Sequence, residues 1–306
     1  MGDIARILRV GCVALLAVPW ISIARADVEL PSKFSYRDGV ANTRHNMTQR
    51  QPGGGGPTGS TMDAYRNDYG EVCVYCHTPH GAHAHINLPL WNRTIKATTY
   101  RTYAELGTSS LTQQVAQPGA SSLACLSCHD GQVAVDSIVN MPGSGRYNPA
   151  QATVQNDSFL NAWTNPRGPL AVEHMALEAV NPRGCLSCHS AGAGAAGKGA
   201  GDFTISALGT DLRNDHPVGV GFPLTIDFRQ PTAGRPGLRW FDADGDGRPD
   251  GPEVRVYEST EGLRVECGSC HDPHGVPSAG PGSPFLRAFL RVSNQASGLC
   301  LTCHAK

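Results

Sequence analysis

The chain has 306 residues, of which 40% are hydrophobic but only 7% aromatic, and its formal net charge is -1. A chain without excess positive charge is poorly suited to bind nucleic acid. Its 36 Gly and 22 Pro argue against long helices or strands, because Gly carries an entropic cost there and Pro lacks a backbone donor. We therefore expect the fold to be held together by more than apolar side chains, and the 11 Cys and 12 His are the residues that could provide this.

The N-terminus has the pattern of a secretory signal peptide over residues 1–26. Arg6 and Arg9 give a positive start, and an apolar run over residues 10–23 is followed by small residues. The run is too short for a membrane-spanning helix, and no later segment qualifies. Cys12 has Arg9 where a lipid-anchor signal has an aliphatic residue, which argues against such an anchor. We therefore expect an exported chain, periplasmic or extracellular, that keeps ten cysteines after cleavage.

These ten cysteines form five CxxC pairs, and a histidine directly follows each pair. Two intervening residues make about one helical turn, so both thiols face the same way. C-x-x-C-H is the attachment sequence of c-type haem, with the histidine as the proximal ligand of the iron. The predicted attachment cysteines and proximal ligands are Cys73, Cys76 and His77; Cys125, Cys128 and His129; Cys185, Cys188 and His189; Cys267, Cys270 and His271; and Cys300, Cys303 and His304.

Other uses of CxxC pairs account for less of the pattern. Zinc sites pair CxxC units but have no need of a histidine after every one. A thioredoxin-like redox centre has a single CxxC in a βαβ context, which is missing here. A disulfide framework suits an exported chain, yet it too leaves the five histidines unexplained. The sequence therefore predicts five covalently attached haems c.

Seven histidines lie outside these motifs, and five of them are predicted distal ligands of the irons. His80 and His274 each follow a proximal histidine by three residues. Each is tethered on the proximal side of its own haem, so we expect it to serve a neighbouring haem. The predicted distal ligands are His45, His80, His174, His216 and His274, with Met47 and Met175 as rival ligands and with His83 and His85 left over.

A small β-rich insert is expected before the fourth motif. Residues 51–61 and 190–202 have the composition of flexible linkers. Beyond the second linker, residues 224–228 and 253–257 alternate apolar and polar side chains as short strands do.

Between these two segments lies a candidate calcium loop. Residues 242–253 place acids at positions 1, 3, 5, 9 and 12 of a twelve-residue loop, with Gly at position 6 for the sharp turn. Clustered carboxylates repel one another unless a hard cation lies among them. The Pro and Gly around them favour a hairpin or a turn over a helix–loop–helix, and the alternative is an acidic, solvated turn. The predicted Ca²⁺ ligands are Asp242, Asp244, Asp246, Arg248, Asp250 and Glu253.

A repeat links the two ends of the chain. CxxCHxPHG followed downstream by CLxCH occurs over residues 73–129 and again over residues 267–304. In these motifs the chain resembles the multihaem cytochromes with doubled CxxCH motifs. The resemblance implies bis-histidine haems in closely stacked pairs and a role in respiratory electron transfer. The expected fold is a loop-rich multihaem cytochrome c, with short helices at the CxxCH motifs, a haem-packed core and the small β-rich insert.

The expected organisation is a signal peptide at 1–26, a trihaem region at 27–190, a linker plus insert with His216 and the calcium loop at 191–264, and a dihaem module at 265–306. Removal of the signal peptide leaves a net charge of about -3, and five haems bring it to about -8 oxidised or about -13 reduced if all propionates ionise. Such a surface disfavours nucleic acid and anionic membranes, and it favours brief contacts with a basic patch on a redox protein.

The expected function is electron transfer rather than enzymatic catalysis, because an iron with two histidine ligands has no open position. Two alternatives to this function are a subunit of a polymerising extracellular cytochrome filament and a multihaem reductase with one open haem. A high-spin ferric signal would indicate the reductase, and a protein that stays monomeric in solution would exclude the filament.

Overall fold

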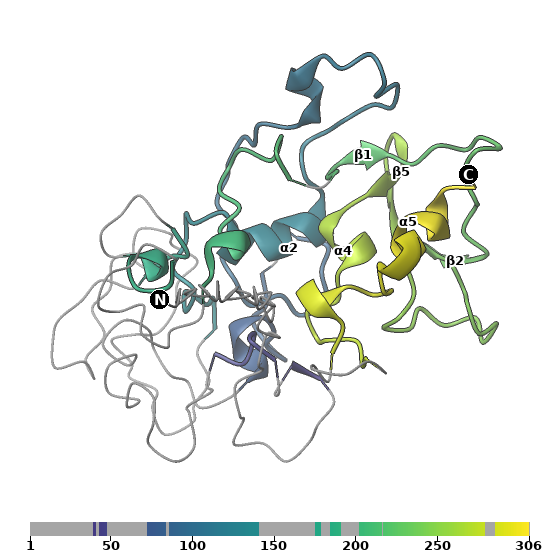
Figure 1. Ribbon diagram of the computed structural model, residues 1–306. Coiled ribbons are helices and arrows are strands. Elements are labelled where there is room, and N and C mark those ends of the chain that lie inside the picture. The colour runs from purple at the N-terminus through teal and green to yellow at the C-terminus, as the bar shows by residue number, and fades with distance from the viewer. Residues whose placement is uncertain are drawn as a thin grey trace, which may run out of the picture.

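The computed structural model describes residues 39–40, 43–47, 72–83, 86–140, 175–178, 184–190, 202–215, 217–278 and 285–305 (Figure 1). Several predictions lie outside the described residues: the signal peptide, residues 51–61 and 191–201 of the two linkers, and His85, His174 and His216.

The helices of the described part are short, and each of the five CxxC pairs begins on one of them; the 3₁₀ turns of the first and third pairs end just before the second cysteine. These are the 3₁₀ turns η2 (Cys73–Tyr75) and η5 (Cys185–Ser187) and the α-helices α2 (Ala120–His129), α4 (Cys267–Cys270) and α5 (Gly298–Cys303). The other 3₁₀ turns are η3 (Tyr103–Leu106), η7 (Thr204–Ser206), η8 (Arg287–Phe289) and η9 (Gln295–Ser297). Helices α2, α4 and α5 follow one another across the molecule (Figure 1). Among the described residues, no helix has the length and apolar character needed to cross a membrane.

An antiparallel sheet of five strands lies between the third and fourth motifs. Its strands are β1 (Val220–Gly221), β2 (Ala233–Arg235), β3 (Leu238–Trp240), β4 (Arg255–Ser259) and β5 (Gly262–Val265), in the order β1-β5-β4-β3-β2. Two-residue turns close the β2–β3 and β4–β5 hairpins, where Arg235 pairs with Leu238 and Ser259 with Gly262. Along β3, Leu238 and Trp240 are buried and Arg239 is exposed, which is the alternation of a sheet with one covered face.

The two strand predictions in this region fared differently. Residues 253–257 overlap β4, which begins at Arg255. The strand predicted over residues 224–228 is wrong, since Leu224 and Ile226 are 76% and 96% exposed and no ladder runs through them. Alternation needs a partner strand to become a sheet. Here the chain instead forms a turn, in which the Gln230 side chain donates to the carbonyls of Pro223 and Phe228.

The apolar core of the described part is divided into small clusters at the motifs. Val74 and Tyr75, the residues between the first pair of cysteines, pack with Ile138, Met47 and Cys76. A second cluster surrounds Leu126, between the cysteines of α2, and consists of Tyr100, Leu126, Leu212 and Val218 with Leu123, Leu208 and Cys267 at its edge. The motif cysteines therefore lie at the borders of the core.

Glu266 connects the starts of α2 and α4. Its carboxylate accepts the N–H of Gly119, the N-cap of α2, at 3.1 Å and also accepts the Ser122 hydroxyl. The same residue is the N-cap of α4, where it forms a capping box with Ser269. The Ser122 hydroxyl in turn accepts the N–H of Cys267 at 2.8 Å. Helix α4 packs on α2 through these bonds and on β4 of the sheet.

Candidate functional site

Each of the five motifs has both thiols and the imidazole on one tight turn. In the four motifs outside α2, the histidine N–H donates to the carbonyl of the first cysteine, at 2.8–3.1 Å; the histidines are His77, His189, His271 and His304. In the second motif the corresponding histidine, His129, is the last residue of α2. All ten motif cysteines are free thiols. The local backbone thus gives every motif two unpaired thiols beside one imidazole.

Three of the predicted proximal imidazoles are oriented by a backbone carbonyl. The Nδ1 atoms of His77, His129 and His271 lie 3.0, 2.6 and 2.7 Å from the carbonyl oxygens of Pro89, Ser206 and Ala288. A carbonyl can only accept, so Nδ1 carries the proton and Nε2 keeps a lone pair. Metal-binding histidines have this arrangement, in which the second ring nitrogen donates to a carbonyl or a carboxylate.

The two CxxCHxPHG segments bind their downstream chain in the same register. In both, the motif imidazole donates to a downstream carbonyl, and the N–H of the residue after the histidine donates to the next carbonyl along the chain. The N–H of the residue two positions after that second carbonyl donates back to the carbonyl of the motif's second cysteine. In the first repeat these bonds are His77 to Pro89, Thr78 to Leu90 and Asn92 to Cys76; in the second they are His271 to Ala288, Asp272 to Phe289 and Arg291 to Cys270. Leu90 and Phe289 share a left-handed backbone. The sequence repeat is therefore also a repeat of local structure.

Two pairs of imidazoles lie at the separation expected for two ligands of one metal. The ring centroids of His77 and His274 are 6.4 Å apart with nearly parallel planes, at 9°, and those of His45 and His129 are 6.1 Å apart at 86°. With metal–nitrogen bonds of about 2.1 Å, two imidazoles on opposite sides of one ion have centroids about 6.5 Å apart. Each pair joins one predicted proximal histidine to one predicted distal histidine from a remote part of the chain.

The predicted distal imidazoles of both pairs are held at Nδ1. His274 donates to Asp272 at 2.8 Å, and Asp272 is also bound by Arg291 at 3.0 Å. Burial alone would raise the pKa of Asp272, but the hydrogen bonds from His274 and the charge of Arg291 lower it to about 2. His45 donates to the carbonyl of Pro273 at 3.0 Å. Burial, with a smaller contribution from nearby His129, lowers the pKa of His45 to about 4, so its ring stays neutral at physiological pH.

Two of the motif cysteines, Cys76 and Cys128, lie where an uncharged sulfur is favoured, whereas nearby Cys125 lowers the pKa of Cys267. Burial raises the pKa of Cys76 to about 12, with a further contribution from Cys128, and burial also raises the pKa of Cys128. Among the described residues, the only group of three or more potential metal ligands within 4.8 Å of one another is Asp242, Asp244 and Asp246. The CxxC units are therefore not gathered into the four-ligand clusters of zinc sites, and a thioether suits their environment.

A buried indole supplies a further test of what fits the first motif. Trp91 packs its ring edge-on against His77, with centroids 5.7 Å apart, and the residue is 8% exposed. Its Nε1–H is buried and has no acceptor among the described residues. Because an unmet buried donor costs free energy, an acceptor carried by a bound group would be stabilised here. Haem carries two carboxylates, so the residues of this motif fit it.

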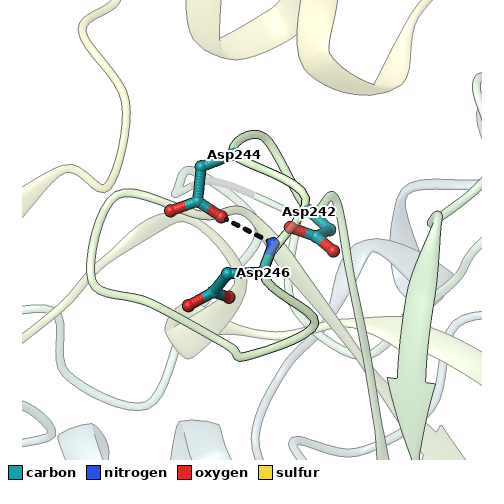
Figure 2. A group of neighbouring side chains, drawn as sticks. All are labelled: Asp242, Asp244 and Asp246. Carbon is teal, nitrogen blue, oxygen red and sulfur yellow. Dashed lines mark hydrogen bonds between the residues drawn. The ribbon is translucent and has the colours of Figure 1, made fainter.

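The loop between β3 and β4 brings together three of the six predicted calcium ligands. The carboxylates of Asp242, Asp244 and Asp246 converge (Figure 2), with one oxygen from each within 4.8 Å of the others. Glu253, at position 12, is buried and closes the loop by accepting the N–H groups of Ala243 at 2.7 Å and Asp250 at 3.0 Å. The loop therefore lies on a β-hairpin, with Glu253 in a structural role and the three aspartates facing solvent.

The remaining predicted ligands are placed less tightly. His189 stacks on Phe203 at 4.1 Å, and His304 lies 4.6 Å from Phe228. His80 is exposed and has no ring partner among the described residues. Sequence reasoning missed Trp91 and the pair Asp272–Arg291. Asp272 lies within the CHDPHG segment, where an acid two residues before a candidate ligand was the available signal.

No protein-family model matches this chain, and no curated protein matches it.

Proposed function

We propose that this protein is a pentahaem c-type cytochrome that relays electrons outside the cytoplasm through closely spaced haems with two histidine ligands. The observation that carries the proposal is the two imidazole pairs, His77 with His274 and His45 with His129, at 6.4 and 6.1 Å. The signal-peptide pattern of the first 26 residues supports export.

In this proposal the ten thiols anchor the haems and the five following histidines bind from the proximal side. His274 is the distal ligand at the first motif, and His45 is the distal ligand at the second. The bound haems supply one-electron redox chemistry at iron. The protein's own residues fix the ligands: carbonyls orient His77, His129 and His45, and the Asp272 carboxylate orients His274. At the first and second motifs, two histidine ligands would leave the iron no open position, which favours electron transfer over bond chemistry.

Contacts between motifs support the close spacing. The thiols of Cys125 on α2 and Cys267 on α4 lie close enough to shift each other's pKa, upward at Cys125 and downward at Cys267. Besides burial, the nearby thiol of Cys128 raises the pKa of Cys76, and the nearby thiol of Cys270 raises the pKa of Cys303. Groups attached at these sulfurs would lie edge to edge, as an electron relay requires.

The intact mass of the mature protein tests the attachment. We expect five added haem masses. A mature protein without any added haem mass would refute the proposal. Electron paramagnetic resonance then tests the ligands: the ferric protein should be low-spin, and His274→Ala and His45→Ala should each convert one haem to a high-spin form. His83→Ala is the matched control and should stay low-spin. Variants that remain entirely low-spin would contradict the assignment of His274 and His45.

A further inference from the structure

The largest fully buried side chain among the described residues is that of Arg93, which is 0% exposed. A guanidinium does not lose its proton in proteins, so Arg93 places a permanent positive charge in the interior. Burying a charge is costly unless it is paired or fully hydrogen-bonded. The partners of Arg93 therefore decide how much of its field remains.

The guanidinium of Arg93 is bound by uncharged oxygens. Nε donates to the Ser127 hydroxyl at 3.0 Å and Nη2 to the Ser127 carbonyl at 2.8 Å. Nη2 and Nη1 also donate to the carbonyls of Ala134 and Val135, at 3.0 and 2.7 Å. No carboxylate of the described residues forms an ion pair with it, whereas the other buried arginine, Arg291, pairs with Asp272 at 3.0 Å. Arg93 is thus held by dipoles and keeps its charge uncompensated by a carboxylate.

Arg93 lies between the first and second motifs. Its neighbour Asn92 donates its backbone N–H to Cys76 at 2.8 Å and its side-chain amide to Val74 at 2.7 Å, and both belong to the first motif. Ser127, which receives two of the guanidinium bonds, lies between the two cysteines of the second motif. The adjacent residues Asn92 and Arg93 therefore join the two attachment turns.

Two buried carboxylates lie near the second motif, and neither is ion-paired with Arg93 among the described residues. Asp130 follows His129 and Asp136 follows Val135, and they are 6% and 0% exposed. Asp130 instead accepts hydrogen bonds from the Tyr100 hydroxyl at 2.8 Å and from the Gln132 N–H at 2.9 Å. The charge of Arg93 therefore acts on the attachment turns from a buried position, where low polarity makes charges act strongly.

We propose that Arg93 is an electrostatic tuning residue that raises the reduction potentials of the haems attached at the first and second motifs. The inference rests on the proposed function. One electron from an external reductant lowers the charge of the iron site by one, and no bond forms or breaks. A fixed positive charge nearby disfavours the oxidised form more than the reduced form. These two haems would therefore accept electrons more readily than they would without Arg93.

A spectroscopic redox titration of the holoprotein tests the proposal. In Arg93→Gln, about two fifths of the haem absorbance change should move to lower potential. The reduction equilibrium constant should fall about tenfold, which for one electron is about 59 mV. Arg93→Lys retains the charge and should stay near the wild type. Arg101→Gln, which removes an exposed arginine paired with Glu105 and Asp211, is the charge-matched control and should shift nothing.

Every outcome decides between tuning and scaffolding. Arg93→Gln protein with five haems and unchanged potentials would overturn the tuning role. If Arg93→Gln fails to fold, an unshifted, folded Arg93→Lys protein supports the proposal. Failure of both variants to attach five haems would make Arg93 a scaffold residue only and overturn it. A wild-type protein without any haem would instead refute the proposed function, and the intact mass distinguishes the two failures.

Discussion

At the scale of single residues, Gly219 shows how closely the chain packs beside the second cluster. Its N–H donates to Val265 of β5, and its carbonyl accepts the N–H of Ala116, both at 2.9 Å. Its φ of +71° is left-handed, and a Cβ added there would lie 2.4 Å from the Ala116 carbonyl oxygen. The atoms nearest to such a Cβ belong to the main chain of Ala116 and Gln117, so no side-chain rotation can relieve the overlap. Only glycine meets both conditions.

Gly219→Ala should therefore destabilise the protein by about 2–4 kcal/mol, from the left-handed conformation and the steric overlap together. Gly237→Ala is the matched control, because Gly237 also has a positive φ, +87°, but its Cβ would have nothing within 4 Å. The control should lose only about 1–2 kcal/mol. Denaturant unfolding of the holoproteins measures both losses. Equal losses would show that the close approach to Ala116 does not limit this position.

At the scale of elements, the acidic residues of the β3–β4 loop have two different roles. Glu253 is buried and accepts two backbone N–H groups, so it defines the loop without a cation. The triad of Asp242, Asp244 and Asp246 is largely exposed, and its internal bonds are turns such as Asp246 N–H to Asp244 at 3.1 Å (Figure 2). Exposed carboxylates with few further ligands would bind Ca²⁺ weakly.

The calcium prediction is tested at that weak affinity. Extracellular modules bind Ca²⁺ with dissociation constants of about 10⁻⁴–10⁻³ M, so 10 mM Ca²⁺ should stabilise the protein by about 1–3 kcal/mol over a chelated sample. The double variant Asp244→Asn/Asp246→Asn should lose this gain, and Asp202→Asn, which removes another exposed acid, should keep it. Denaturant midpoints with and without Ca²⁺ measure the effect. A wild-type midpoint insensitive to Ca²⁺ would identify the loop as an acidic turn.

The elements differ in how well the sequence predicts them. The turn at each CxxCH was predictable because its spacing is local and about one helical turn long. The pairing of His45 with His129 and of His77 with His274 was not, since the tether from each CxxCH fixes only its own imidazole. The failed strand over residues 224–228 has a related cause. Its side chains alternate, but both sides of β4, the other predicted strand, are already paired, with β3 and with β5. Local periodicity cannot report which neighbour a segment finds.

At the scale of the whole molecule, the motifs are unequally embedded. Leu126 and Ser122 of α2 are fully buried, and Cys125 meets Cys267 of the fourth motif. The second motif is therefore connected to the first through the adjacent residues Asn92 and Arg93, and to the fourth through Glu266. Helix α5, which carries the fifth motif, has no buried residue, and Leu301 between its cysteines is 40% exposed. Loss of one attached group should thus have consequences that depend on position.

Removing the cysteines of the second or the fifth motif tests this ranking. In the proposed pentahaem protein, Cys300→Ala/Cys303→Ala should yield a folded chain with four haems, because α5 buries none of its residues. Cys125→Ala/Cys128→Ala should expose the cluster around Leu126 and separate α2 from α4. We expect its proteolysis to be at least about tenfold faster than that of the first variant, equivalent to about 1.4 kcal/mol of opening free energy. Intact mass counts the remaining haems, and limited proteolysis measures the rates. Equal protease resistance of the two variants would mean that the haems, rather than the buried contacts of α2, determine the stability of the centre.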